Sequence, residues 1–428
     1  MLLLRRCARA LVTVFCLLLL FGVAACGRVE LRTQTPSAAD AEAVTPLKIG
    51  LLMSLGEGMS DRDLVRRRSF ELAIKHINAA GGVFGRPVEV AIADSTLDPE
   101  VAVKEARRLV EVEGVHAIVG PGTSANTLPV AESVAGPAGI PFISPSATSP
   151  LVTSVVDNDF LFRVALSDTA QGPVLARVTR ERGFTNVGVI YRDDAWGQGL
   201  AAAFAAAWEG EAMVVAVDPN QASFLPALRR TARAGAQALV VITFGDEGII
   251  IVREAIAHGL YDQFTFGDSL KSPRVVQEIG GEHLGGMYGT AGASDPASVS
   301  KAAWEEAYAA EYGAATEYGY VKETYDATIA LALAAQAAGS VDGAAIRNQL
   351  RAIGSGPGVV VTAGVESIAA GLQVLAEGGD IDYEGAATTL DWDEHGDLRR
   401  GHIGVWRFTT DEGIEEVEVV PFEAPAQK

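Results

Sequence analysis

The segment Leu47-Lys-Ile-Gly-Leu-Leu-Met53 begins the part of the chain that decides the fold. This short apolar run is typical of a strand that is buried on both faces of a parallel sheet. Apolar residues then recur from Phe70 to Ile77 at the spacing of one helix face, and Gly81-Gly82 ends that helix. A second apolar run, Val88–Ala93, follows. The order strand, helix, strand predicts a parallel βαβ unit.

The same alternation continues along the chain and predicts two series of βα units. Strands are expected at residues 116–119, 140–143, 162–165, 187–191, 213–217, 238–243 and 264–266, and helices at residues 98–113, 124–135, 171–182, 199–208, 224–234 and 247–258. The chain from Pro296 to Gly379 is expected to be mostly helical, and β-hairpin material is expected from Thr388, around Asp393–Gly396. Two such series imply an α/β protein with two doubly wound parallel-sheet lobes.

The composition is that of an ordinary globular protein with an acidic excess. Of 428 residues, 49% are apolar and 21% are charged, which argues against a mostly disordered chain. Lys and Arg number 34 against 54 Asp and Glu, which gives a net charge of −20. Nucleic acids and anionic membrane surfaces attract basic proteins, so neither is expected to bind the globular part.

The N-terminal segment has the features of a targeting signal. Three arginines within residues 5–9 precede an apolar run, residues 10–21, that is too short to cross a bilayer comfortably. Val23-Ala24-Ala25 then leads to Cys26. The segment resembles a bacterial lipoprotein signal, in which residues 1–25 are removed and Cys26 is lipidated. A plain signal peptide and an uncleaved membrane anchor are the alternatives.

The cysteines agree with this interpretation. The chain has three, and the two besides Cys26, Cys7 and Cys16, lie within the expected signal. The mature chain is therefore expected to form no intrachain disulfide and to offer no cysteine-ligated metal site. Residues 26–46 have no usable apolar period and predict a flexible tether, so the folded body is expected to begin near Leu47.

Six motifs occur in order along the folded body. They are Ile49-Gly-Leu-Leu52, Ile77-Asn-Ala-Ala-Gly-Gly-Val-Phe-Gly-Arg-Pro-Val88, Ala117-Ile-Val-Gly-Pro121, Ile143-Ser-Pro-Ser-Ala-Thr148, Tyr191-Arg-Asp-Asp-Ala-Trp-Gly-Gln-Gly-Leu200 and Leu390-Asp-Trp-Asp-Glu-His-Gly-Asp397. Together they resemble the type I periplasmic binding proteins, in the leucine/isoleucine/valine-binding branch that serves ABC importers. The resemblance covers about Leu47 to Phe408, which is nearly the whole expected mature chain.

The resemblance implies a two-lobe architecture in which three crossing strands join the lobes and ligand binds between them. Carried onto this chain, the crossings fall near Ala165, Thr290 and Thr388. The lobes would comprise residues 47–165 with 291–388, and residues 166–290 with 389–428. Parallel sheets support this placement, because ligands bind beyond the carboxyl ends of parallel strands, where helix N-termini converge.

The resemblance places the ligand's carboxylate against two loops of the first lobe. Ser124 follows the strand at 116–119, and its alternative role is an ordinary helix N-cap. Ser146, Ala147 and Thr148 follow the strand at 140–143, and in the resembling proteins this loop offers backbone groups and a hydroxyl to the ligand's α-carboxylate. The alternative for this loop is a turn rich in Ser and Thr.

The second lobe would supply an aromatic wall and an acid. Trp196 and Phe244 stand at positions that are often Tyr in the family, so two phenolic hydroxyls are missing here, and core packing is the alternative for Trp196. Asp268 follows the short strand at 264–266 and stands where an acid meets the ligand's α-ammonium. Its alternative role is a helix cap or an Asx-turn.

Three other patterns suggest ligand or metal sites but lack the residues or the spacing that these sites need. Gly197–Ala202 matches a dinucleotide-binding fingerprint, but residues 192–196 separate its glycines from the preceding strand. Asp391–His402 resembles a calcium loop but has His at the positions that require acids, and a hairpin turn explains it better. Glu57 and Asp61 are better explained by surface solvation than by contact with a basic ligand. No metal and no cofactor are therefore expected.

These observations predict a lipid-anchored extracytoplasmic substrate-binding protein, not an enzyme. It would bind an amino acid or a similar small amphiphilic solute between two closing lobes, and deliver it to an ABC permease and ATPase complex. Only the N-terminal lipid would contact the membrane. A sensor or regulatory lipoprotein with the same fold is the first alternative, and an exported NAD-linked enzyme is the second.

Overall fold

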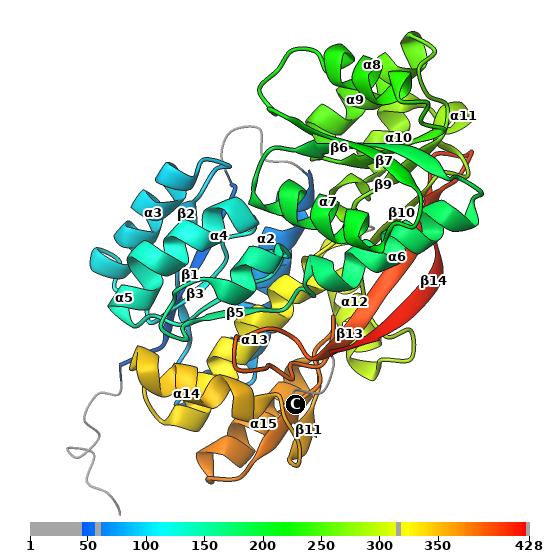
Figure 1. Ribbon diagram of the computed structural model, residues 1–428. Helices are drawn as coiled ribbons and strands as arrows, with labels where there is room; N and C mark the ends of the chain where they lie inside the picture. The colour runs from blue at the N-terminus through cyan, green and yellow to red at the C-terminus, as the bar shows by residue number, and fades with distance from the viewer. Residues whose placement is uncertain (1–44, 56–60, 314–317, 425–428) are drawn as a thin grey trace, which may run out of the picture. The chain divides into compact units, whose positions relative to one another are not determined.

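The computed structural model describes residues 45–55, 61–313 and 318–424, so Cys26, residues 26–44 of the tether and Glu57 lie outside the described residues. Within this part the first sheet has five parallel strands in the order β2-β1-β3-β4-β5 (Figure 1). They are β1 Lys48–Met53, β2 Glu89–Asp94, β3 Ala117–Val119, β4 Phe142–Ser144 and β5 Leu161–Arg163. The register places Leu51 beside Ile92 and Val119.

Helices cover both faces of this sheet. They are α2 Asp61–Ala79, α3 Pro99–Glu111, α4 Ser124–Val130 and α5 Gly136–Ala138, with a π-helical turn, η1, at Ala131–Ala135. Leu51 packs in one core with Phe70 of α2, whereas its neighbour Leu52 packs in another core with Leu109 of α3. Because successive strand side chains point to opposite faces, one apolar run supplies both cores.

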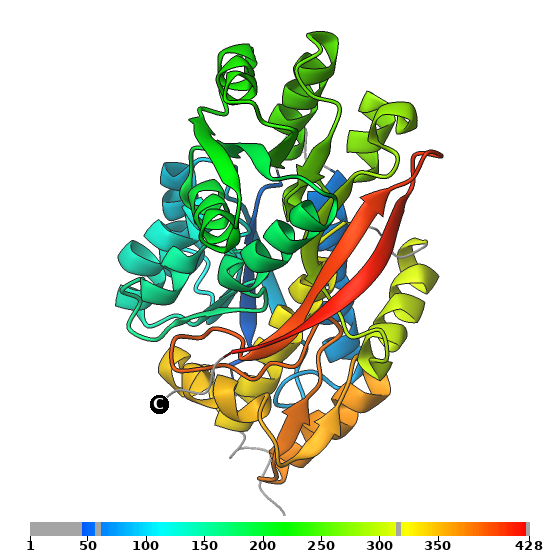
Figure 2. The same cartoon turned by 45° about the vertical axis from the view of Figure 1, so that its right-hand side comes forward.

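The second sheet has seven strands within the described residues, in the order β14-β13-β10-β9-β8-β6-β7. They are β6 Asn186–Arg192, β7 Glu211–Val217, β8 Ala238–Ile242, β9 Phe264–Phe266, β10 Tyr288–Ala293, β13 Arg400–Phe408 and β14 Ile414–Glu423. Strands β6 to β10 pair in parallel, while β13 pairs antiparallel with both β10 and β14. Figure 2 shows the long β13–β14 hairpin in red.

This sheet is also covered on both faces. Its helices are α6 Asp168–Glu181, α7 Ala195–Ala207, α8 Leu225–Arg233, α9 Gly245–Ala257, α10 Pro273–Ile279, α11 Gly281–Leu284 and the 3₁₀ turn η3 Asp268–Leu270. Val189 of β6 packs with Leu175 of α6 and Phe204 of α7 in one core. Ile190, its neighbour, packs with Leu228 of α8 in the core on the other face. Each sheet with its helices is called a lobe below.

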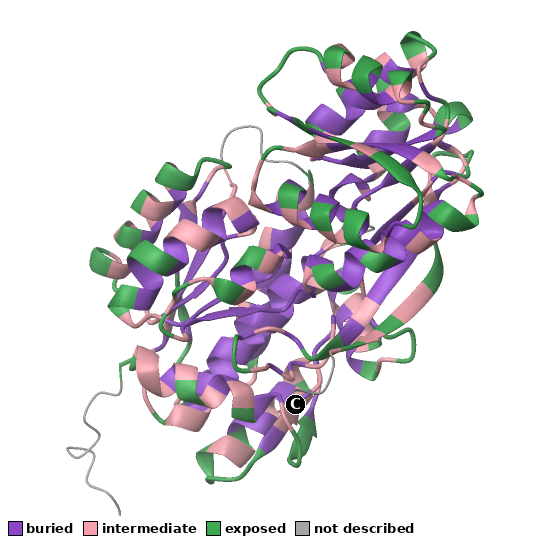
Figure 3. Ribbon diagram, viewed as in Figure 1, coloured by how far each residue is buried: buried purple, intermediate pink, exposed green. Residues whose placement is uncertain are grey.

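The chain between β10 and β13 returns to the first lobe. It forms α12 Val299–Tyr312, α13 Val321–Ala338, α14 Gly343–Ile353 and α15 Val365–Ala376, with a small parallel sheet of β11 Val359–Val361 and β12 Ile381–Tyr383. Leu331 and Leu333 of α13 lie in the same core as Leu51, and Figure 3 shows α13 buried over most of its length. Among the described residues no single helix is long and apolar enough to span a membrane, although α13 and α14 taken as a bent pair pass on length and composition.

The chain passes three times between the lobes, before α6, after β10 and between β12 and β13. The predicted fold class, two doubly wound lobes joined by three crossings, is confirmed. The hairpin expected around Asp393–Gly396 is only a turn, flanked by an isolated bridge between Trp392 and Leu398. Trp392 explains the difference, because its indole N–H donates to the carbonyl of Arg163 at 2.8 Å and holds this turn on the first lobe. The long hairpin instead joins β13 to β14 around residues 409–413.

Candidate ligand-binding cleft

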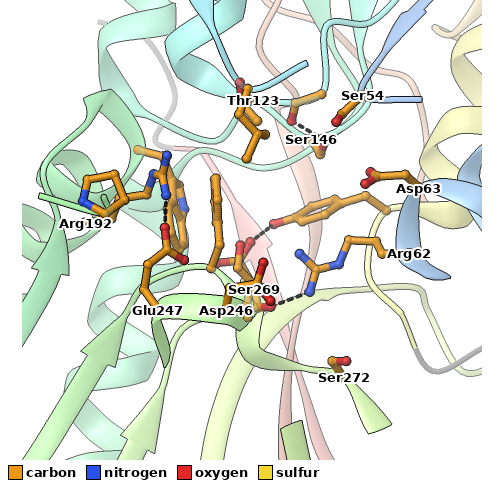
Figure 4. A pocket seen from close by; sticks show the side chains of 18 of the residues that line it. Ser54, Arg62, Asp63, Thr123, Ser146, Arg192, Asp246, Glu247, Ser269 and Ser272 are labelled. Atoms are coloured by element: carbon orange, nitrogen blue, oxygen red, sulfur yellow. Dashed lines mark hydrogen bonds and ion pairs between the residues drawn. The ribbon is translucent and has the colours of Figure 1, made fainter. Parts of the chain in front are cut away.

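A cleft of about 1150 Å³ lies at the carboxyl ends of both parallel sheets (Figure 4). The residues that line it and follow strands include Ser54, Thr96, Ser124 and Ser146 from the first lobe, and Arg192, Phe244 and Asp268 from the second. Parallel strands bring loops and helix N-termini together at this edge, and that arrangement makes it a site for polar and anionic groups.

Two loops of the first lobe are joined by short hydrogen bonds. The hydroxyls of Ser144 and Ser146 each donate, at 2.6 Å, to a carbonyl of the loop at residues 120–124. In return the backbone N–H of Ser149 donates to the hydroxyl oxygen of Ser124 at 3.1 Å. These bonds hold the loops after β3 and β4 as one unit at the edge of the cleft.

Ser124 lines the cleft as predicted, but it is not the helix cap. Thr123 is the N-cap of α4, since its hydroxyl oxygen accepts from the backbone N–H of Asn126 at 3.3 Å. The alternative that Ser124 is an ordinary N-cap is therefore wrong. Its oxygen is used as an acceptor by Ser149, and its own O–H remains a donor that a ligand can use.

Ala147 and Thr148 lie behind the cleft surface. Both side chains are buried, and neither is among the residues that line the cleft. The Thr148 carbonyl accepts from the backbone N–H of Asp168 at 2.8 Å. Within the described part of the chain, the Thr148 hydroxyl makes no hydrogen bond of standard geometry, but it lies near enough to Asp168 to lower the pKa of that carboxyl. Thr148 therefore contacts Asp168 with its carbonyl and lies near it with its hydroxyl, away from the residues that line the cleft.

The second lobe provides a stacked wall. The rings of Trp196 and Phe244 stack with centroids 5.1 Å apart, and the Arg192 guanidinium lies 4.5 Å from the Phe244 centroid on the same wall. Arg192 is held by Asp194 at 2.7 Å and by Glu247, the pair drawn in Figure 4. Burial raises the pKa of Glu247, and Arg192 opposes that rise. Trp196 and Phe244 both line the cleft, as predicted.

Asp268 also lines the cleft, and its side chain is buried. Its Oδ2 accepts from the hydroxyl of Tyr320 at 2.6 Å, while Oδ1 makes no hydrogen bond of standard geometry among the described residues, although the side chain of Gln171 lies near enough to lower the pKa of this carboxyl. Neither oxygen bonds the start of α10, so the alternative of a helix cap is wrong. Burial raises the pKa of Asp268, against the stabilising effects of the Tyr320 hydroxyl and of the Arg62 charge.

Asp168, which we did not predict, is a second buried acid close to Asp268. It is the first residue of α6, and neither carboxylate oxygen makes a hydrogen bond of standard geometry within the described residues, although the nearby Thr148 hydroxyl lowers its pKa. Burial raises its pKa well above the usual range, and the charge of Asp268 raises it further. Like Thr148, it lies behind the lining residues.

Helix α2 and the start of α13 contribute residues that were also missed. Arg62 donates to the carbonyl of Ser269 across the cleft (Figure 4). Arg66 donates to the carbonyl of Gly319 at 3.1 Å, and its guanidinium lies 5.3 Å from the ring centroid of Tyr320. Burial, and next the charge of Arg62, lower the pKa of Arg66 to about 10. These contacts position Tyr320 to reach Asp268.

The structure therefore brings together five of the seven predicted ligand residues at the cleft surface. They are Ser124, Ser146, Trp196, Phe244 and Asp268, with Ala147 and Thr148 buried behind them. Asp61, expected to be solvated, lines the cleft as well. Of the missed residues, Arg62 lies in the first turn of α2, and Tyr320 is the left-handed turn residue directly before α13, so no local motif marks either of them.

Two doubly wound lobes that face each other across such a cleft define a class of two-lobe ligand-binding proteins. The sequence profile of the family described as "Periplasmic binding protein" matches residues 46–372, so the chain belongs to the periplasmic binding protein family. Members of this family are binding proteins that act outside the cytoplasm, and they are not enzymes.

The chain is similar to relatives with known names. It is 26% identical over 403 residues to the chemotactic signal transduction system substrate-binding protein BasB of Halobacterium salinarum, over 88% of this chain and 90% of that protein. It is 27% identical over 315 residues to the leucine-, isoleucine-, valine-, threonine-, and alanine-binding protein of Pseudomonas aeruginosa, over 72% and 83%. Among solved structures, LivJ of Streptococcus pneumoniae in complex with isoleucine has a TM-score of 0.73, with 24% identity, over 88% of this chain and 100% of that one. The predicted resemblance to the branched-chain amino acid branch is confirmed.

Proposed function

We propose that this protein binds an amino acid, or a close analogue, between its two lobes and delivers it to an ABC importer. The observation that carries the proposal is the opposed chemistry of the cleft walls. The first-lobe wall is lined by Ser124, whose O–H is not used as a donor among the described hydrogen bonds, and by Ser146, whose O–H is donated to the Gly122 carbonyl, whereas the second-lobe wall carries the buried carboxyl group of Asp268. One wall suits the carboxylate of a zwitterion and the other suits its ammonium.

Thr148 would complete the carboxylate side when the lobes close on the ligand. Ala147 contributes backbone to the same loop. Trp196 and Phe244 would contact the ligand's side chain as a flat apolar wall. The names of the Pseudomonas and Streptococcus relatives, which include leucine and isoleucine, support an aliphatic amino acid as the first ligand to test.

The transport role rests on closure and anchoring. We propose residues 47–165 with 291–388 as one moving lobe and 166–290 with 389–428 as the other, except that the turn around residues 393–396, which Trp392 holds against the first lobe, would move with the first lobe. Closure would give an importer two states to distinguish. Lipidation at Cys26 would hold the protein at the membrane, and the tether of residues 26–46 would let the lobes reach the permease.

A thermal-shift panel of the twenty amino acids, leucinamide and benzoate tests the ligand class. A ligand at a hundred times its Kd adds about 2.7 kcal/mol to the stability of the native state. We expect one or more aliphatic amino acids to raise the Tm and leucinamide to raise it less, because the amide lacks the carboxylate. If no amino acid raises the Tm, the proposed ligand class is wrong.

A sensory role is the second candidate, and the name of the Halobacterium relative favours it. A permease gene and an ATPase gene beside the coding sequence would support import. A receptor gene in that position, together with failure of the ligand to accumulate in cells through this protein, would support sensing.

A further inference from the structure

The strand β5 ends in a buried arginine that the ligand chemistry described so far does not use. The Arg163 side chain is 1% exposed, and all five of its N–H groups have partners. Nε and Nη2 donate to the two carboxylate oxygens of Asp397, each at 2.6 Å. Nη2 also donates to the hydroxyl of Thr153 at 2.9 Å. This is a fork-to-fork ion pair in the interior of the protein.

The remaining two N–H groups of Arg163 bind the loop at residues 146–149, which is called the binding loop below. Nη1 donates to the carbonyl of Ala147 at 3.3 Å and to that of Ser149 at 3.0 Å. In a trans peptide the C=O and the following N–H point in opposite directions. Because the Ala147 carbonyl points toward the guanidinium, the N–H of Thr148 points away from it. That N–H has no hydrogen-bond partner within the described residues.

Asp397 connects this arrangement to another part of the chain. It lies in the segment between β12 and β13, one of the three crossings, and the backbone N–H of Arg163 donates to the Gly396 carbonyl at 3.0 Å. The Thr153 hydroxyl donates to Asp397 at 2.7 Å, which completes a triangle with Arg163. A buried guanidinium needs this counter-charge, since removing one partner of a buried pair leaves an uncompensated charge.

We propose that the Arg163–Asp397 pair is a positioning element for ligand recognition, which sets the peptide plane between Ala147 and Thr148 so that the Thr148 N–H faces the ligand's carboxylate. This proposal rests on the proposed amino-acid function. Arg163 acts through the loop and does not contact the ligand. The conformation of the binding loop would therefore depend on the position of the crossing segment that carries Asp397.

Two variants of the full-length protein, and one control, test this role. Asp397→Asn keeps the shape and deletes the counter-charge, while Thr153→Val removes only the bridging hydroxyl and serves if Asp397→Asn does not fold. Asp159→Asn is the control, because Asp159 pairs with Arg347 and Arg351 in the same lobe without contacting the binding loop. Calorimetry measures the affinity for L-leucine, competition measures the preference for L-leucine over L-leucinamide, and hydrogen exchange monitors residues 146–149.

We expect Asp397→Asn to lower L-leucine affinity about tenfold or more, to reduce the preference for the acid over the amide, and to speed exchange in the loop. Thr153→Val should change the affinity, the preference and the exchange rate in the same direction, but by a smaller amount. Asp159→Asn should change none of these three quantities. A lower Tm with unchanged affinity, preference and exchange would overturn the proposal. If the parent binds no amino acid, the proposed function fails, and faster loop exchange in Asp397→Asn alone would still support positioning of the loop.

Discussion

The sharpest test of the cleft is Asp268→Asn, which deletes a charge and keeps the shape of the side chain. Asp268 is 4% exposed. Its Oδ2 accepts from Tyr320 at 2.6 Å, and its Oδ1 makes no hydrogen bond of standard geometry in the described residues. This oxygen is buried, and the side chain of Gln171 and the backbone N–H of Asp268 lie near the carboxyl group, so an ammonium would bind it by displacing the groups that cover it. An asparagine would present either a neutral oxygen or an N–H₂ group that repels the ammonium.

The magnitude follows from the burial. Removing the partner of a buried, hydrogen-bonded charge pair costs about 2–5 kcal/mol, which is about a 30-fold to 4,000-fold loss of affinity. The free energy of unfolding of the ligand-free variant, in contrast, should not fall. Burial raises the pKa of Asp268 above its unfolded value, so its contribution to stability is full below the unfolded pKa and is lost as pH rises through the folded pKa. The ligand-free variant should therefore be as stable as the parent near pH 7, or more stable.

Calorimetry with the best ligand of the panel, combined with thermal unfolding without ligand, measures both effects. Asp246→Asn is the matched control, because Asp246 also lines the cleft but is an exposed acid paired with Arg274. We expect the control to bind within about threefold of the parent, since exposed pairs contribute about 0–1 kcal/mol. Equal affinities of the parent and Asp268→Asn would refute the role of Asp268 and weaken the case for an amino-acid ligand.

Three further predictions concern anchoring, closure and pH. Labelled fatty acid should be incorporated into the parent and not into Cys26→Ala, and an unlabelled parent would contradict lipidation. Fluorophores on Val112→Cys and Glu209→Cys, exposed positions of the two lobes, should change their distance on saturation with ligand, and an unchanged distance with a bound ligand would contradict closure. Asp326 has a pKa of about 7 because burial raises it against three hydrogen bonds, so its stabilising contribution should be full below about pH 4 and should be lost as pH rises through 7. Denaturant unfolding at pH 5 and pH 8 should show a smaller difference for Asp326→Asn than for the parent, and an equal difference would exclude this group as the cause.

The helices and strands could be predicted because each requires a local pattern of apolar and capping residues in the sequence. A strand buried on both faces needs a run such as Leu47–Met53, and β1 occupies Lys48–Met53. A helix start needs a capping oxygen, and Asp98 caps α3 as its place before Pro99 suggests. The local pattern did not identify the N-cap of α4, because two neighbouring residues, Thr123 and Ser124, both have a hydroxyl that could cap the helix.

Most of the cleft lining after strand ends was also predictable, since parallel topology brings the carboxyl ends of strands to one edge. The loops that contain Ser124, Ser146 and Asp268 follow from this rule and from the family resemblance. The hairpin expected around Asp393–Gly396 could not be placed correctly, because contacts with distant residues of the first lobe, from Trp392 and Asp397 to Arg163, decide where that segment lies.

By itself, then, the sequence determined the order of the elements, the two-lobe class and the strand ends that face the cleft, because each depends on residues only a few positions apart. Only the tertiary structure decided that Tyr320 meets Asp268, 52 residues away, and that Arg163 meets Asp397, 234 residues away. It also buried Asp168 near Asp268, and burial first, with the charge of Asp268 second, raises the pKa of Asp168. The physical reason is that periodicity is imposed along the chain by the backbone, whereas the partner of a buried charge is decided by which side chains the packed lobes enclose together.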